Sequence, residues 1–177
     1  TTIGSLALAE SIALISGNID VSVDRIVGFV GVLAAKLIIS FPINPYLAIF
    51  LPVVLGTLCG CFNGLLVGIL RLNPFVSTLA TSMVFSGLLL ITSSTSLWSL
   101  PKVYLYIGGN MGFAIIMFFC ILVLFWFILR YTTLGRNIYA VGGNPFAALM
   151  LGVNLKKTIF ATYAIVGMVC GLATLFY

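Results

Sequence analysis

Charged residues are what this 177-residue sequence has least of. Aspartate, glutamate, lysine and arginine together make up 6% of the chain, whereas 62% of the residues are hydrophobic. A soluble domain carries about 25% charged residues, because its surface must be hydrated. The composition therefore excludes a water-soluble globular protein, and we expect lipid to surround most of the folded surface.

Side chains that usually carry enzyme chemistry are also scarce. The sequence has no histidine, the commonest metal ligand and a frequent general base, and only three acids, Glu10, Asp20 and Asp24. An intramembrane enzyme would need a serine–lysine or aspartate pair, and no motif surrounds Lys36 or Lys102. We predict that the chain is not an enzyme and that it holds no catalytic residue, metal or cofactor.

The cysteines follow no metal-binding or disulfide pattern. Cys59 and Cys61 are two residues apart, about 200° around a helix, so they form no chelating face. We interpret them, with Cys120 and Cys170, as small apolar residues inside helices.

Long apolar runs are the main structural signal. A spanning helix needs about 20 mostly apolar residues, and lipid-exposed strands would show an alternating polarity that is missing here. We predict an all-α fold in one transmembrane domain, residues 1–177: a polytopic helix bundle of about six spans. Because the sequence lacks an initiator methionine and both its ends are apolar, we expect a piece of a longer protein. The expected spans are Ile3–Ser16, Ile26–Phe41, Tyr46–Leu70, Phe75–Thr92, Met111–Leu129 and Thr158–Tyr177.

The basic residues predict an orientation, because cytoplasmic loops carry an excess of lysine and arginine. With residues 131–157 in the cytoplasm, Lys36 and Lys102 fall outside, and the reverse topology would invert the asymmetry. Six basic residues then lie inside, namely Arg25, Arg71, Arg130, Arg136, Lys156 and Lys157.

Glycines recur at every fourth position of the third expected span. A glycine stripe lets a second helix backbone approach closely, so we interpret it as a packing surface. Alternatively, the same helix also borders a transport path, because the polar Asn63 adjoins the stripe. Gly167 and Gly171 repeat the spacing in the last span. The stripe consists of Gly56, Gly60, Gly64 and Gly68.

A polar segment, SGNIDVSVDR, separates the first two expected spans at residues 16–25. Polar groups at membrane depth must be buried in protein or must line water. Asp20 and Asp24 are four residues apart, so they would form an acid dyad on a helix, and a role along a substrate path is one alternative. The other is that the carboxylates cap the next span, with Arg25 as a counter-charge.

The longest polar stretch is RYTTLGRNIYAVGGNPFAALMLGVNLKK, residues 130–157. We expect Gly142, Gly143 and Asn144 to break the chain there. They do not form a nucleotide-binding loop, because no strand precedes them and no Gly-Lys-Ser/Thr follows. The chain is therefore not expected to hydrolyse ATP itself.

A short helix is expected immediately after this break. Asn144 suits its cap, Pro145 its first position and Gly152 its end. The helix between them, PFAALML, would be mostly apolar although it lies outside the membrane. An exposed apolar helix requires a partner that covers it, so we predict a docking element.

Three motifs carry a resemblance to a known family. The stretch from residue 132 to 157 resembles the cytoplasmic coupling segment of ABC-importer permeases of the ribose, galactose and autoinducer type, which are related to branched-chain amino-acid permeases. SGNIDVSV resembles the family's Gly-Gly-Ile-Asp-Leu-Ser-Val-Gly, and NPFVSTLATSMVFSG its Pro-Phe-Ile-x-Thr-Leu-Gly-Thr. The motifs keep the family's order and spacing over nearly the whole chain. The sequence departs from them at Asn18, Asp24 and Ala80, and at Ser86, where the family usually has arginine.

The resemblance implies a permease subunit in the bacterial cytoplasmic membrane. It implies three partners: an ABC ATPase that binds the ATP, an extracytoplasmic solute-binding protein, and a second permease subunit, identical or different; no nucleic acid is expected. By the same resemblance, the ATPase contact falls on Gly142, Gly143, Asn144, Pro145, Phe146, Ala147, Ala148, Leu149, Met150 and Gly152. The candidate substrate path comprises Asn18, Asp20, Ser22, Asn63, Phe75, Thr78 and Thr81.

The expected solute is a sugar or a similar small neutral molecule. Few charges but many hydroxyl, amide and aromatic groups lie in the apolar runs, which favours a polyhydroxylated solute over a charged one. Nucleosides and branched-chain amino acids are the alternatives within transport, and an intramembrane enzyme is the alternative from another class.

Overall fold

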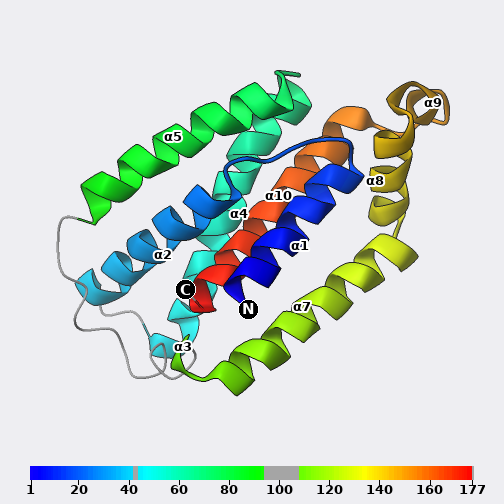
Figure 1. Cartoon of the computed structure of the whole chain (residues 1–177). Helices are drawn as coiled ribbons and strands as arrows, with labels where there is room; N and C mark the ends of the chain where they lie inside the picture. Colours follow the sequence, from blue (N-terminus) through cyan, green and yellow to red (C-terminus); the bar gives the residue numbers. More distant parts are fainter. Residues whose placement is uncertain (42–43, 94–107, 177) are drawn as a thin grey trace.

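The computed structural model describes residues 1–41, 44–93 and 108–176, and within these ranges it contains helices and no strands (Figure 1). The predicted all-α bundle is thereby confirmed. Its elements are α1 (Thr2–Ile15), α2 (Val23–Ser40), α3 (Pro45–Ala48), α4 (Phe50–Gly64), the π-helical η1 (Leu65–Ile69), α5 (Pro74–Thr92), α7 (Met111–Tyr131), α8 (Thr133–Gly143), α9 (Pro145–Met150), α10 (Leu155–Ala173) and the 3-10 segment η2 (Thr174–Phe176).

Four helices in the described ranges are long and apolar enough to cross a membrane: α4 with η1, α5, α7 and α10. The chain is therefore a multi-pass membrane protein. α1 is apolar but has only 14 residues, whereas α2 has 18 residues and carries Asp24, Arg25 and Lys36. That α1 and α2 also cross the membrane stays a prediction.

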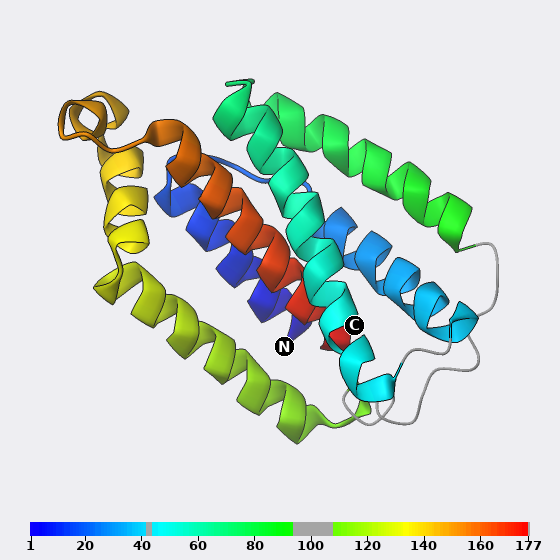
Figure 2. The ribbon, with the colours of Figure 1, turned by 180° about the vertical axis from the view of Figure 1, so that it is seen from behind.

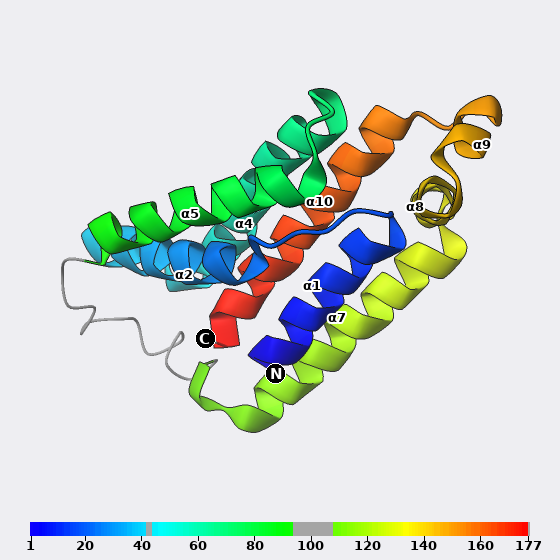
Figure 3. The ribbon, with the colours of Figure 1, turned by 45° about the horizontal axis from the view of Figure 1, so that its top comes forward.

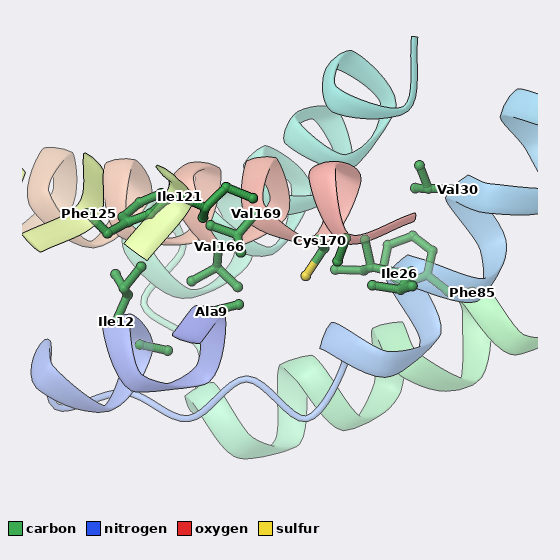
Figure 4. Packing of buried hydrophobic residues seen from close by; sticks show 13 residues of the cluster. Ala9, Ile12, Ile26, Val30, Phe85, Ile121, Phe125, Val166, Val169 and Cys170 are labelled. Carbon is green, nitrogen blue, oxygen red and sulfur yellow. The ribbon is translucent and has the colours of Figure 1, made fainter. Parts of the chain in front are cut away.

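α10 lies at the centre of the bundle, with α5 and α7 at opposite edges (Figures 1 and 2). Buried side chains from α1, α2, α5, α7 and α10 meet in one apolar core, which includes Ile12, Ile26, Phe125 and Val166 (Figure 4). α7 is the least buried of the four spans. Its outer face is therefore the surface best suited to lipid.

The glycine stripe of α4 faces α10. A side-chain carbon added at Gly60 would overlap the carbonyl oxygen of Tyr163, and one at Gly167 would overlap that of Gly56. Gly64 and Gly68 face Phe160 in the same way, at the point where α4 passes into η1. The two backbones touch, and only glycine leaves room for this contact.

Basic residues gather at the end of the bundle that carries α8 and α9. Arg71 lies two residues after η1, Arg130 is in the last turn of α7, and Lys156 is in the first turn of α10. These elements meet at that end (Figure 1). Arg25 is in the first turn of α2, after the linker from α1. Lys102 lies outside the described residues. The assignment of this end to the cytoplasm stays a prediction.

Site-directed labelling tests this orientation. We expect single cysteines at Leu151 and Met111, in a cysteine-free background, to react with impermeant reagents from opposite sides, because they lie at opposite ends of the bundle and are 81% and 78% exposed. Leu151→Cys should be labelled from the cytoplasmic side only. Labelling of both positions from one side would contradict the orientation.

Candidate functional site

A linker of seven residues, 16–22, joins α1 to α2 and runs across the bundle (Figure 3). It begins with a turn in which Gly17 has φ +76°, a conformation that favours glycine. The Asn18 amide then donates to the carbonyl of Ser16 at 3.0 Å, and the Asn18 N–H donates to the carbonyl of Ala13 at 3.1 Å. These bonds satisfy the end of α1 and direct the chain back into the bundle.

The second half of the linker forms a buried polar network with α4. One carboxylate oxygen of Asp20 accepts from the Ser22 N–H at 2.9 Å and from the Ser22 hydroxyl at 2.5 Å. The Asn63 amide donates to the Ser22 hydroxyl oxygen at 2.7 Å and to Asp20 at 3.4 Å. All three side chains are at most 1% exposed. A carboxylate buried in this way needs these donors.

Three other helices hold the linker backbone. Thr78 on α5 accepts from the Val21 N–H at 3.2 Å, and the Tyr163 hydroxyl on α10 donates to the carbonyl of Ile19 at 3.1 Å. Glu10 on α1 accepts from the Asp20 N–H at 3.3 Å. The linker is thus fixed between four helices. We refer to its second half, residues 19–22, together with Glu10, Asn63, Thr78 and Tyr163 as the linker site.

The linker site lies within the bundle rather than at its end. Asn63 precedes Leu70, the residue after η1, by seven residues, or roughly 10 Å along a helix. Because Ser22, just before α2, binds Asn63, α2 begins inside the bundle, away from the end at which η1 stops. An irregular backbone at this depth is stable only where it is buried in protein or lines water. Here residues 16, 18, 20 and 22 are buried, whereas Gly17, Ile19 and Val21 are exposed on the other face of the linker.

The two aspartates of the linker region have separate roles. Asp20 is not helical and binds Ser22 and Asn63, whereas Asp24 lies in the first turn of α2 and pairs with Arg25 at 3.6 Å. The acid dyad is therefore not formed. Asp24 makes no capping hydrogen bond either, and only its place in the first turn and its pairing with Arg25 agree with the other alternative. A negative charge in the first turn of α2 favours the helix dipole.

The structure joins four of the seven predicted path residues and separates the other three. Asp20, Ser22, Asn63 and Thr78 belong to the linker site. Asn18 bonds locally, the Thr81 hydroxyl donates to a carbonyl of its own helix at 3.1 Å, and Phe75 is exposed at the start of α5. Whether any of them contacts a solute stays a prediction.

Two members of the linker site were missed by sequence reasoning. Tyr163 gave no signal, because a single tyrosine in an apolar helix is common. Glu10 was noticed as a lone acid without a recognisable partner. In the described part of the chain, Glu10 Oε2 and Asn63 Oδ1 are the buried side-chain atoms that have no hydrogen-bond partner. The linker site therefore keeps two hydrogen-bond acceptors without a donor, whereas the Asn63 amide already donates to Ser22 and Asp20.

The predicted short helix is present as α9, and the Asn144 side chain caps it by accepting from the Ala147 N–H at 3.0 Å. Gly152 follows it with φ +82°. Phe146 and Met150 are 69% and 70% exposed, and Leu149 is also exposed. α9 therefore presents an apolar surface at the end of the bundle.

Two features of this predicted segment differ in the structure. Gly142 and Gly143 do not break the chain but end α8, so the break falls at Asn144 alone. Ala148 is buried, because α9 packs on α8 and α10, and it does not belong to the exposed docking face. Ala148 was predicted as a contact residue, but tertiary packing directs its side chain inward.

Gly142 connects the α9 region to the linker. A side-chain carbon at Gly142 would overlap the carbonyl oxygen of Ile15 and would lie 3.1 Å from the Gly17 nitrogen. One at Gly17 would lie 3.4 Å from the Gly142 Cα. The end of α8 thus touches the turn from which the linker starts, in a contact between two glycines.

Several known proteins are similar in sequence to this chain. The chain is 33% identical to the D-allose transport system permease protein of Escherichia coli strain K12, over 95% of this chain and 53% of the relative. It is 34% identical to the ribose import permease protein of Bacillus subtilis strain 168, over 96% of this chain and 55% of the relative. A fructose import permease protein of Rhizobium meliloti is 26% identical, over 97% of this chain and 51% of the relative.

The chain spans about half the length of these curated relatives. No solved structure matches it. The family described as the permease component of the branched-chain amino acid transport system matches residues 1–177, which is the whole sequence. The motifs, the helix bundle and this match agree, and the chain belongs to that permease family.

Proposed function

We propose that this chain forms the central membrane part of a permease subunit of an ATP-binding-cassette importer for sugars. A separate ATPase would supply the energy, an extracytoplasmic protein would deliver the solute, and a second permease subunit would complete the path. The observation that carries this proposal is α9, a capped helix whose exposed apolar face extends from the basic end of the bundle.

The apolar face of α9 is suited to a groove on a cytoplasmic ATPase. Phe146, Leu149 and Met150 are exposed together, and water is an unfavourable neighbour for a surface of this kind. The asparagine cap and the glycine after the helix fix its direction. A partner that binds α9 therefore acts on a rigid element.

Movement of α9 would reach the membrane interior through α8. The Gly142–Gly17 contact joins the end of α8 to the linker, and the linker is bonded to α1, α4, α5 and α10. Because these bonds join the linker to all four helices, we expect a displacement of the linker to displace the start of α2. We propose that the solute passes beside the linker site when the helices around it rearrange.

A sugar is the favoured solute for two reasons. The relatives named for allose, ribose and fructose cover nearly the whole of this chain. Asp20 is also already engaged by Ser22 and Asn63, and the free buried oxygen of Glu10 can accept a hydrogen bond from a hydroxyl group. A neutral polyhydroxylated solute needs no counter-charge. A branched-chain amino acid is the alternative, because the family description names that class.

Uptake into proteoliposomes tests the proposal. We expect the complete permease, reconstituted with its ATPase and binding protein, to accumulate a labelled pentose or hexose on addition of ATP, and excess leucine not to compete. Uptake of leucine that excess sugar does not reduce would support the alternative. Absence of ATP-dependent uptake of either class would contradict a permease role.

Docking of α9 gives a separate prediction. We expect Leu149→Glu to weaken binding of the ATPase by at least about tenfold, because the new carboxylate would be buried without a partner in the groove. The substituted side chain is exposed in the permease itself, so the variant should elute normally in size-exclusion chromatography. ATPase co-purification and ATP-driven uptake are the measurements.

The matched control is Leu72→Glu, which places the same charge on an exposed leucine in the turn after η1, outside α9. It should leave ATPase binding unchanged. Equal binding of the ATPase by the wild type and Leu149→Glu would show that α9 is a solvent-exposed helix and not the docking element. Ala148 is unsuitable for this test, because its methyl group is buried and a glutamate there would disturb folding.

A further inference from the structure

A basic pocket lies where α7 ends and α8 begins. Its volume is about 540 Å³, and it is lined by Trp126, Leu129, Arg130, Arg136 and Tyr139. The pocket thus combines two guanidinium groups with two aromatic rings that carry polar atoms. It is separate from the linker site and from the exposed face of α9.

The corner between α7 and α8 fixes the two arginines on either side of it. The Thr132 hydroxyl donates to the carbonyl of Ile128 at 2.6 Å and accepts from the Gly135 N–H at 3.2 Å. A side-chain carbon at Gly135 would overlap the carbonyl oxygen of Leu129, so the chain turns as closely as a glycine permits. The tight corner brings Arg130, before it, and Arg136, after it, to one pocket.

The positive charge of this pocket is not balanced within the described chain. The sequence has three acids in all, and none of them lines the pocket. Glu10 and Asp20 are bonded in the linker site, and Asp24 is paired with Arg25. Two arginines without a carboxylate form a site for an anion, and guanidinium groups match phosphate in geometry.

An apolar hollow on the outer face of α7 leads to the same pocket. It has a volume of about 650 Å³, its lining includes Ile116, Phe119 and Val123, and Trp126 lines both it and the basic pocket. α7 is the least buried of the four spans, and this face is exposed in the described chain. Tryptophan and tyrosine are enriched where a membrane meets water. The apolar hollow matches the acyl chains of a phospholipid, and the two arginines match its phosphate.

We propose that Arg130 and Arg136 bind the phosphate of an anionic phospholipid whose acyl chain lies along the outer face of α7. A soluble phosphate would use the arginines but not the apolar hollow, so the continuity of the two favours the lipid. Basic pockets at helix ends on the cytoplasmic side are a recurrent form of such lipid sites. The inference does not depend on the proposed transport function, because its readout is lipid selectivity.

Quenching of Trp126 fluorescence by brominated lipid tests the proposal. The full-length protein with its other tryptophans replaced, including Trp98→Phe, is reconstituted in phosphatidylcholine with a minor fraction of brominated phosphatidylglycerol. We expect quenching well above the value set by the lipid fraction alone. In the Arg130→Gln/Arg136→Gln variant the enrichment should fall by about fivefold for each arginine removed.

Arg71→Gln is the matched control, since Arg71 lies at the same end of the bundle but lines neither the basic pocket nor the apolar hollow. It should keep the wild-type enrichment. Quenching of the wild type at the level of the lipid fraction, or equal enrichment in the double variant, would overturn the proposal. Loss of the enrichment on addition of inorganic phosphate would assign the pocket to a soluble anion and overturn the lipid assignment.

Discussion

Gly60→Leu is expected to prevent assembly of the bundle. The first side-chain carbon alone would overlap the carbonyl oxygen of Tyr163 and would lie 2.8 Å from the Cα of Gly167. Overpacking in a core usually costs only about 1–3 kcal/mol, because neighbouring side chains can move aside. Here the atoms in the way belong to a helix backbone, which cannot yield without separating α4 from α10. We expect a cost above this range and a loss of most folded protein from the membrane.

Size-exclusion chromatography of a fluorescent fusion measures this yield. Gly87→Leu is the matched control, because Gly87 also lies inside a spanning helix but has no atom within 4 Å of an added side-chain carbon. Its yield should equal or exceed that of the wild type, since leucine favours a helix more than glycine does. Gly60→Ala should already be impaired. A monodisperse Gly60→Leu protein at wild-type yield would contradict the contact between α4 and α10.

Asn63→Leu is expected to abolish transport. The two side chains have the same branching and the same number of non-hydrogen atoms, so the main loss is that of two hydrogen bonds, to Ser22 and Asp20. Removing a donor from a buried carboxylate costs about 1.5–3 kcal/mol, or more when the charge is left without other compensation. Asp20 would keep only its bonds to Ser22 and would be released from α4. The start of α2 would then lose its hydrogen-bonded attachment to α4.

Thr162→Val separates this effect from a general loss of buried polarity. Thr162 is as fully buried as Asn63, but its hydroxyl donates only to the carbonyl of Thr158 in the same helix, at 2.9 Å. We expect nearly normal uptake from Thr162→Val and at least a tenfold decrease from Asn63→Leu, measured in proteoliposomes together with the melting temperature of each protein. Similar uptake and melting temperatures for the two variants would exclude a special role of the linker site.

The sequence by itself determined the class of protein, the long apolar helices and the family, although it did not predict α8. A chain with 6% charged residues cannot cover a surface in water, and runs of about 20 apolar residues can satisfy their backbone in lipid only as helices. Local chemistry likewise determined α9, because an asparagine cap, a proline and a later glycine act within a few residues. The four-residue spacing of glycines in α4 is also a local pattern. It indicated a close helix contact, although it did not identify the partner helix.

Only the tertiary structure decided which of these features meet. That Asn63 binds Ser22, that Tyr163 holds Ile19 and that Gly142 touches Gly17 are contacts between residues 41, 144 and 125 positions apart, counted from these residue numbers. No periodicity or motif records such pairings, because they depend on the order in which the helices pack. The same holds for Ala148, whose small size permits either a docking surface or a buried contact. Packing on α8 and α10 selected the buried contact.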